Sequence, residues 1–183
     1  MRALVTGGAG FIGTNLIKKL LEDGYDVVSF DNYSTGFKEN EQDGCDYINM
    51  DITNKFEDWV EKFDVIFHLA ALARIQPSIK NPEPAIDVNV SGTLNVLEYA
   101  RKNNTQVIYA GSSSKHHGLY GSPYAWSKYG GEELCKLYSS VYDLNTTICR
   151  FYNVYGEHHI REGAYATVIG IFEHQYLNNI PLT

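Results

Sequence analysis

Three glycines near the start of the chain have the spacing of a phosphate-binding turn. Gly7, Gly10 and Gly13 follow a short apolar run and precede an amphipathic segment. This order is typical of a strand, a tight turn and a helix N-terminus. Glycines let the backbone approach a pyrophosphate, whose charge is stabilised by the free N–H groups and the positive dipole of the helix. The pattern predicts a dinucleotide site, with an ordinary glycine-rich turn as the alternative.

An acidic residue stands where a ribose would lie. Asp31 is 18 residues after Gly13 and follows a second apolar run, Val27–Phe30. A carboxylate at this place accepts hydrogen bonds from the adenosine ribose. The same charge would repel a 2′-phosphate, so we expect NAD rather than NADP as the cofactor.

Tyr124 and Lys128 form a second chemical pattern. Ser122 is typical of a helix N-cap and Pro123 of the first helical position, so Tyr124 and Lys128 share one face of the helix that follows. A phenol titrates near ~10, and a neighbouring ammonium or a helix N-terminus favours the phenolate. Such a pair can take a proton from a substrate hydroxyl while hydride leaves the same carbon. Since roughly one such spacing is expected by chance, its position downstream of the dinucleotide pattern carries the argument.

A serine-rich turn follows the expected strand Val107–Ala110. A hydroxyl at the carboxyl end of that strand could stabilise developing charge on a substrate oxygen. Serines in a row are also typical of a polar turn, and the local sequence does not say which one would face a ligand. Ser112 and Ser113 therefore both remain candidates.

The elements that must position these residues alternate along the chain. Apolar runs and helical periodicity predict one α/β domain, a doubly wound parallel sheet that binds ligands at the carboxyl ends of its strands. The expected strands are Arg2–Thr6, Val27–Asp31, Tyr47–Met50, Val65–Leu69, Val107–Ala110 and Thr146–Phe151. The expected helices are Phe11–Glu22, Lys55–Glu61, Ala85–Lys102, Tyr124–Tyr142 and Ala164–Leu177.

Composition narrows the class of protein. A chain of 183 residues with 44% hydrophobic content can bury one sizeable core. Its net charge of −7 argues against nucleic acid and anionic membranes as partners. Cys45, Cys135 and Cys149 have no metal-type spacing and are typical of free thiols in a reducing compartment. With neither a leader pattern nor a membrane-spanning run, we expect a cytoplasmic location.

The histidines offer weaker signals. Adjacent pairs at 116–117 and 158–159 seldom point the same way, and no carboxylate or cysteine completes a ligand set, so we expect no metal. His68 lies within an apolar strand and is interpreted as a hydrogen-bonded core residue.

The ordered set of motifs resembles a known family. In sequence order they are Thr6–Gly13, Asp31–Asn32, Asp51–Ile52, His68–Ala71, Asn89–Thr93, the serine turn, Tyr124 with Lys128, and Arg150–Gly156. Together they resemble the extended short-chain dehydrogenase/reductases, specifically the NAD-dependent epimerase/dehydratase family of nucleotide-sugar enzymes such as UDP-glucose 4-epimerase. The resemblance extends from residue 2 to the end of the chain.

The resemblance implies roles for the matching residues. Tyr124 would be the base, Lys128 would favour its phenolate and hold the nicotinamide ribose, and Ser112, or else Ser113, would be the catalytic hydroxyl; Ser112 matches the family pattern better. Asn153 would contact the sugar nucleotide. The implied cofactor-binding residues are Gly7, Gly10, Phe11, Ile12, Gly13, Asp31, Asn32, Asp51, Ile52, Leu69, Ala70, Ala71, Asn89, Tyr124, Lys128 and Phe151.

Two departures from the family shape the expected activity. Dehydratases carry a carboxylate just after the catalytic hydroxyl, whereas Ser114, Lys115 and His116 stand here, which favours epimerisation at the sugar C4. A dehydratase or decarboxylase relative is the alternative. Family members are also longer, so we expect the smaller C-terminal substrate domain to be mostly absent, with its first residues beginning near 157. A shortened NAD-binding protein without turnover is the third reading.

The resemblance also implies an assembly. In the family, helices matching Ala85–Lys102 and Tyr124–Tyr142 pair between subunits as a four-helix interface. We therefore expect a homodimer whose small-molecule partner is a nucleotide-diphosphate sugar.

Overall fold

Six parallel strands form a single sheet in this computed structural model, which describes residues 1–56 and 61–183. The strand order is β3-β2-β1-β4-β5-β6, the doubly wound arrangement that the sequence predicts. The chain crosses from β3 back to β4 on the other side of β1, and this reversal opens a crevice at the carboxyl ends of the strands. The strands are β1 (Arg2–Thr6), β2 (Asp26–Asp31), β3 (Cys45–Asn49), β4 (Val65–His68), β5 (Gln106–Ser112) and β6 (Thr146–Phe151).

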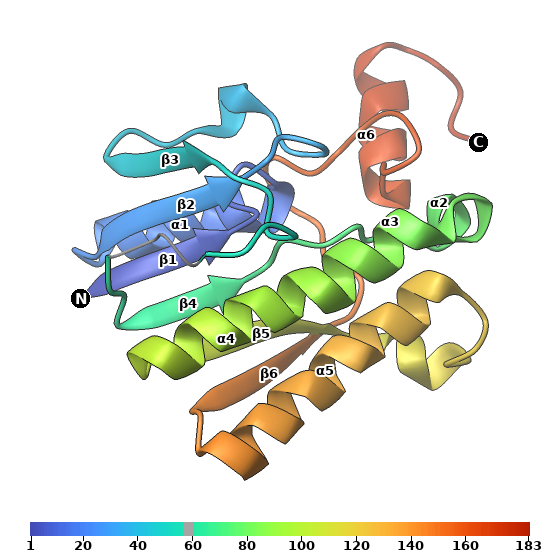
Figure 1. The fold of residues 1–183 in the computed structure, drawn as a ribbon. Coiled ribbons are helices and arrows are strands. Elements are labelled where there is room, and N and C mark those ends of the chain that lie inside the picture. Colours follow the sequence, from blue (N-terminus) through green and yellow to red (C-terminus); the bar gives the residue numbers. More distant parts are fainter. Residues whose placement is uncertain (57–60) are drawn as a thin grey trace.

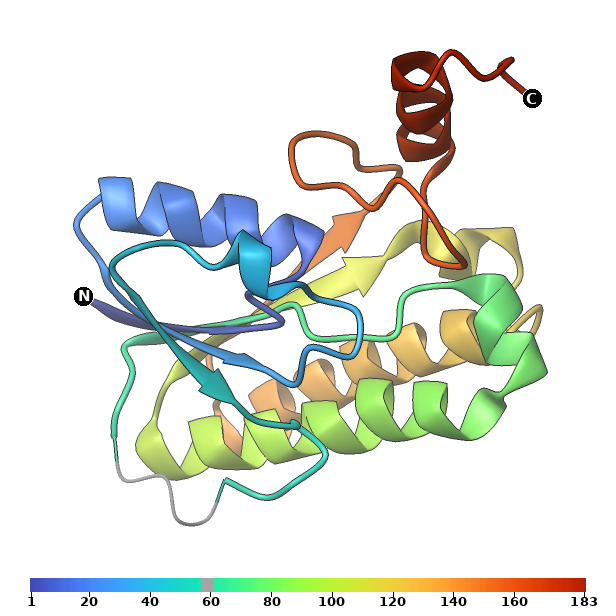
Figure 2. The ribbon, with the colours of Figure 1, turned by 90° about the horizontal axis from the view of Figure 1, so that it is seen from above.

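Helices cover both faces of the sheet (Figures 1 and 2). Helix α1 (Phe11–Glu22) lies on one face, and α4 (Thr93–Asn103) and α5 (Pro123–Tyr142) lie side by side on the other. Helix α6 (Val168–Leu177) stands apart, beyond the carboxyl ends of the strands. Sequence and structure therefore agree on the class of fold.

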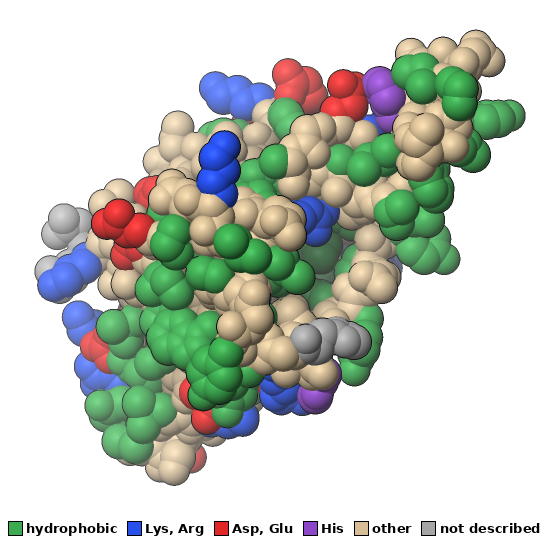
Figure 3. Space-filling model, turned by 90° about the vertical axis from the view of Figure 1, so that its right-hand side faces the viewer, with side chains coloured by type: hydrophobic (Ala, Val, Ile, Leu, Met, Phe, Trp, Pro, Cys, Tyr) green, Lys and Arg blue, Asp and Glu red, His purple; other side chains and the backbone are tan. Residues whose placement is uncertain are grey.

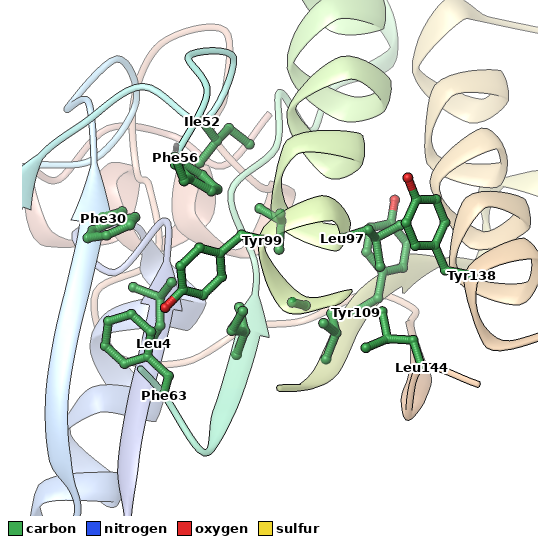
Figure 4. Packing of buried hydrophobic residues seen from close by; sticks show 14 of the residues in the cluster. Leu4, Phe30, Ile52, Phe56, Phe63, Leu97, Tyr99, Tyr109, Tyr138 and Leu144 are labelled. Carbon is green, nitrogen blue, oxygen red and sulfur yellow. The ribbon is translucent and has the colours of Figure 1, made fainter. Parts of the chain in front are cut away.

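The main core lies between the sheet and the α4–α5 layer (Figure 4). Tyr99 of α4 packs against Phe56 and Phe63 with ring centroids 6.1 and 6.2 Å apart, and Phe30 of β2 joins the same group. Aromatic side chains of this size dominate the burial of apolar area. This packing fixes β2, whose last residue is Asp31, against the helices.

The expected helix Ala85–Lys102 is a composite. It begins earlier, with α3 (Pro82–Ile86), passes through a π-helical turn at Asp87–Gly92 and continues as α4. A π-turn widens the backbone locally and is frequent at functional sites, and periodicity alone does not reveal it.

The remaining differences are a short helix that was not predicted and shifts at the ends of elements. Helix α2 (Ile75–Lys80) was not predicted because its six residues are too few for a periodic signal. Helix α6 begins at Val168 rather than Ala164, because the side chain of Thr167 caps it by accepting from Gly170 N. Most of the expected helix Lys55–Glu61 lies outside the described residues. No helix in the described part of the chain is long and apolar enough to span a bilayer.

Candidate functional site

A cavity of about 930 Å³ opens at the carboxyl ends of the strands. Figure 3 looks onto this side of the molecule and shows its surface hollowed there. The volume is at the upper end of the range for small-molecule sites, as an extended ligand requires. The predicted site residues that line the cavity are Gly7, Gly10, Phe11, Ile12, Gly13, Asp31, Asn32, Asp51, Ile52, Leu69, Ala70, Ala71, Ser112, Ser113, Tyr124, Lys128, Phe151 and Asn153.

The glycine-rich turn is packed too closely for side chains. A Cβ on Gly13 would lie 2.2 Å from the carbonyl oxygen of Gly7, and one on Gly7, where φ is +76°, would lie 2.8 Å from the amide nitrogen of Ala70. Gly10 is the N-cap of α1, and no side chain in the described structure caps that end of the helix. The first N–H groups of α1 are therefore available to an anion in the cavity.

Asp31 is held at the edge of the cavity by two backbone amides. Its Oδ2 accepts from Ala9 N at 2.9 Å and its Oδ1 from Tyr33 N at 2.8 Å. Burial raises the pKa of the Asp31 carboxyl, while these two bonds oppose the rise. Each oxygen has a lone pair left, so the fixed carboxylate can still accept from a ligand hydroxyl.

Asp51 and Asn32 form the neighbouring wall. Asn32 Nδ2 donates to Asp51 Oδ2 at 2.8 Å, and Thr53 N donates to Asp51 Oδ1 at 2.9 Å. Ile52 is buried, and a Cβ on Gly92 of the π-turn would lie 2.7 Å from its Cδ1. The π-helical turn therefore packs closely against Ile52, which lines this end of the cavity.

At the far end of the cavity Tyr124 meets the serine turn. Tyr124 Oη lies 3.3 Å from Ser112 Oγ, which also accepts from Ser114 N at 3.2 Å. Ser113 lines the cavity as well, but Ser112 holds the hydroxyl that contacts the phenol. The turn itself is a short 3₁₀ helix, Ser113–His117, with Ser112 as its N-cap.

The first turn of α5 is fixed by several polar contacts. Ser122 caps the helix by accepting from Ala125 N at 3.1 Å, as expected from the sequence. Tyr124 N donates to Ser78 Oγ at 3.1 Å, and Ser127 Oγ donates to Tyr124 O at 3.0 Å. With both backbone groups of Tyr124 held, its phenol has a defined place over the cavity.

Lys128 is buried one helical turn below Tyr124. Its Nζ lies 4.4 Å from the centroid of the Tyr109 ring. Desolvation lowers the pKa of Lys128 to about 8, while the carboxylate of Glu132 opposes this shift. Lys128 therefore places a poorly hydrated ammonium at the cavity, on the same face of α5 as Tyr124.

Asn89 does not line the cavity. It lies buried in the π-turn, where its Oδ1 accepts from Leu72 N at 2.9 Å and its Nδ2 donates to Leu72 O and Ser127 Oγ. All of its polar groups are used in joining the loop after β4 to α5. These contacts indicate that Asn89 positions the segments that line the cavity and does not itself contact a ligand.

Arg74 lines the cavity and connects two of the segments around it. Its guanidinium donates from Nε and Nη2 to the carbonyl oxygen of Tyr165, at 3.0 and 2.5 Å. This contact joins the β4–α2 loop to the segment before α6, and both line the cavity. A partner 91 residues away leaves no local signal in the sequence.

His68, His158 and His159 make polar contacts within the fold. His68 is buried between the hydroxyls of Thr6 and Thr93, at 2.7 and 3.0 Å, so its interpretation as a bonded core residue is confirmed. His158 contacts Asn40, whereas His159 Nε2 lies 2.7 Å from Glu173. Among the described residues, no group of three or more His, Cys, Asp or Glu side chains could hold a metal ion.

The fold combines a doubly wound sheet, a glycine-rich turn, a carboxylate at the end of β2 and a Tyr–Lys pair on α5, and this combination is typical of a class of nucleotide-dependent proteins. Residues 3–182 match the model of the NAD dependent epimerase/dehydratase family, and the chain belongs to that family. This agrees with the resemblance drawn from the sequence motifs.

Individual relatives support the assignment. The chain is 34% identical to a UDP-glucose 4-epimerase of Mycolicibacterium smegmatis, with 97% of this chain and 63% of that protein aligned. It is also 34% identical to a UDP-N-acetyl-alpha-D-glucosaminuronate decarboxylase of Bacillus cytotoxicus, with 93% and 60% aligned. The crystal structure of a UDP-glucose 4-epimerase from Thermotoga maritima with UDP-glucose superposes with a TM-score of 0.92 at 30% identity, over 98% of this chain and 64% of that one.

The chain matches only part of the length of these relatives. The chain spans 55 to 63% of the length of these curated relatives and others that it matches.

Proposed function

We propose that the cavity binds NAD and that the protein, with this site, epimerises a nucleotide-diphosphate sugar at C4. The observation that carries the proposal is the contact between Tyr124 Oη and Ser112 Oγ, 3.3 Å apart in a cavity that the glycine turn also lines. A phenol, a hydroxyl and a nearby ammonium at the nicotinamide end are the groups that a hydroxyl oxidation needs.

The residues present fit the cofactor. The tight packing that Gly7 and Gly13 allow in the turn would let a pyrophosphate approach the uncapped N-terminus of α1. Asp31 would accept from the adenosine ribose, Asn32, Asp51 and Ile52 would flank the adenine, and Lys128 would hold the nicotinamide ribose. Bound NAD would supply a hydride acceptor that returns the hydride later in the cycle.

The chain's own groups would handle the proton and the charge on oxygen. Tyr124, as phenolate, would accept the proton of the sugar hydroxyl at C4. It would return the proton after the keto sugar has rotated to present its opposite face. Ser112 would hydrogen-bond the same oxygen and stabilise its negative charge. The ammonium of Lys128 would favour the phenolate through its positive charge.

The acidic residues favour epimerisation over loss of water. Among the described residues that line the cavity, the carboxylates are Asp31 and Asp51, and both lie at the β2–β3 end. A dehydration needs a carboxyl group near the sugar to move a further proton, and the serine turn Ser113–His117 contains no acidic residue. The second candidate is decarboxylation, because a relative of that name aligns over 93% of this chain.

We expect Tyr124→Phe to lower turnover by roughly 10²- to 10⁴-fold, because the general base is lost. The NAD content of the purified protein should not change. Interconversion of UDP-glucose and UDP-galactose measures turnover, and CO₂ release from UDP-glucuronate tests the decarboxylase alternative. Tyr120→Phe, at an exposed tyrosine, is the control. Full activity of the Tyr124→Phe variant would remove the base assignment.

Two further proposals concern organisation. We propose that the segment from about residue 157 begins the substrate-binding part, because Tyr165, Thr167 and Val168 line the same cavity as the proposed cofactor residues. We also propose a homodimer formed through α4 and α5. Its support is a stripe of exposed apolar residues on one face of α5, Trp126, Leu137 and Val141, spaced at helical intervals.

A further inference from the structure

Lys115 lies in the 3₁₀ turn that follows Ser112, and its side chain is turned back toward α5. Its Nζ lies 3.1 Å from Oε2 of Glu132, with only 17% of the Lys115 side chain exposed. The ammonium also lies 5.2 Å from the centroid of the Tyr129 ring. A largely buried ammonium with two favourable partners is far better fixed than a surface lysine.

Glu132 is a firm anchor for this contact. Its side chain is fully buried, and its carboxylate accepts from Arg150 Nε at 3.0 and 3.1 Å and from Arg150 Nη2 at 2.9 Å. The carboxylate therefore stays ionised and immobile beneath Gly111, the residue before Ser112. Because Arg150 already neutralises Glu132, the stability of the buried carboxylate does not depend on Lys115 alone.

The turn that Lys115 anchors carries the serine of the site. Ser112 Oγ accepts from Ser114 N at 3.2 Å and donates to Ser114 Oγ at 2.9 Å. The next residue along the chain is Lys115. A shift of the turn would therefore move Ser114, and with it Ser112 Oγ relative to Tyr124.

We propose that Lys115 is a positioning residue that ties the serine turn to α5 through Glu132 and so keeps Ser112 Oγ against Tyr124 Oη. The part of this proposal that concerns catalysis rests on the proposed function. Its physical basis is that a misplacement of about 1 Å at a reacting group costs up to ~10²-fold in rate.

The test compares Lys115→Met, which keeps the apolar stem, with Lys115→Arg, which restores the charge. Lys136→Met is the matched control, because Lys136 also faces the Tyr129 ring, at 6.0 Å, and pairs with Glu133 but does not contact the turn. Amide hydrogen exchange of residues 111–118 in the full chain reports the turn directly. Turnover of UDP-glucose and NAD content report the site.

In the Lys115→Met variant we expect roughly tenfold faster exchange across 111–118 and roughly tenfold lower kcat, with the KM for UDP-glucose and the NAD content unchanged. Lys115→Arg should restore both, and Lys136→Met should behave as the wild type. Unchanged exchange in Lys115→Met, or unchanged kcat despite faster exchange, would overturn the proposal. Faster exchange of Lys115→Met that extends to β2 would also overturn the proposal, since it would show a general loss of stability.

Failure of the proposed function has a different signature. A wild-type protein that binds NAD but converts no UDP-sugar would contradict the proposed activity. The exchange comparison among the Met, Arg and control variants would still decide whether Lys115 holds the turn.

Discussion

At the residue scale, Lys128 combines a buried position with a side chain that is charged in water. It is buried beside Tyr109, and desolvation lowers its pKa from 10.5 to about 8. Below the folded-state value the ammonium is charged in both the folded and the unfolded protein, so the folded state bears the full cost of burying it. The site therefore keeps its cation at the expense of stability.

We expect Lys128→Met to be inactive but more stable than the wild type at pH 7, by about 3 kcal/mol from the shift in pKa. As the pH rises through 8 the folded wild type loses its proton before the unfolded chain does, so its relative stability increases. The advantage of the Met variant should be about 2 kcal/mol smaller at pH 9.5. Urea unfolding at the two pH values measures this. A difference that does not change with pH would contradict the lowered pKa.

At the scale of elements, the β1–α1 turn is packed tightly against its own backbone. A Cβ on Gly13 would lie 2.2 Å from Gly7 O and 2.6 Å from Gly8 Cα, both backbone atoms that cannot move independently. The conformation of the turn therefore requires that residue 13 has no side chain.

Gly13→Ala should force the turn open and weaken NAD binding by roughly 10- to 100-fold, because the helix N–H groups would no longer converge on the phosphates. Fluorescence titration of the apoprotein with NADH measures the change in Kd. Gly130→Ala is the control: Gly130 lies within α5, where a Cβ meets Val90 Cγ2 at an ordinary 3.5 Å. That variant should bind NADH normally, and equal affinity in both variants would refute the role of the turn.

At the scale of the whole molecule, the α4–α5 layer has a buried and an exposed apolar side. Its inner side packs on the sheet, while Leu137 and Val141 of α5 are 51% and 59% exposed. Exposed apolar residues that recur along one helix face are typical of an interface between subunits.

Leu137→Glu together with Val141→Glu should convert a dimer into monomers, because the interface would have to bury unpaired charges. Sedimentation velocity measures the state of assembly. Leu177→Glu on α6, at a similarly exposed leucine, controls for effects of added charge alone. A wild-type protein that sediments as a monomer would rule out the proposed dimer.

Much of the fold and the cofactor end of the site could be predicted from local sequence. The strand ranges, the turn between β1 and α1 and the N-cap of α5 at Ser122 depend on residues close together in the chain, whose periodicity, backbone freedom and capping are local properties. The spacing of Tyr124 and Lys128 placed them on one helix face for the same reason.

The tertiary structure alone decided how distant segments meet. The sequence left Ser112 and Ser113 open, and the contact with Tyr124 Oη distinguishes them. Asn89 moved from the cavity to the layer behind it, and Arg74 acquired a partner at Tyr165. These outcomes depend on where side chains point across the crevice and on the π-helical turn. A local sequence pattern predicts neither, because each is set by packing between distant segments; the contacts of Ser112 and Arg74 join residues 12 and 91 positions apart.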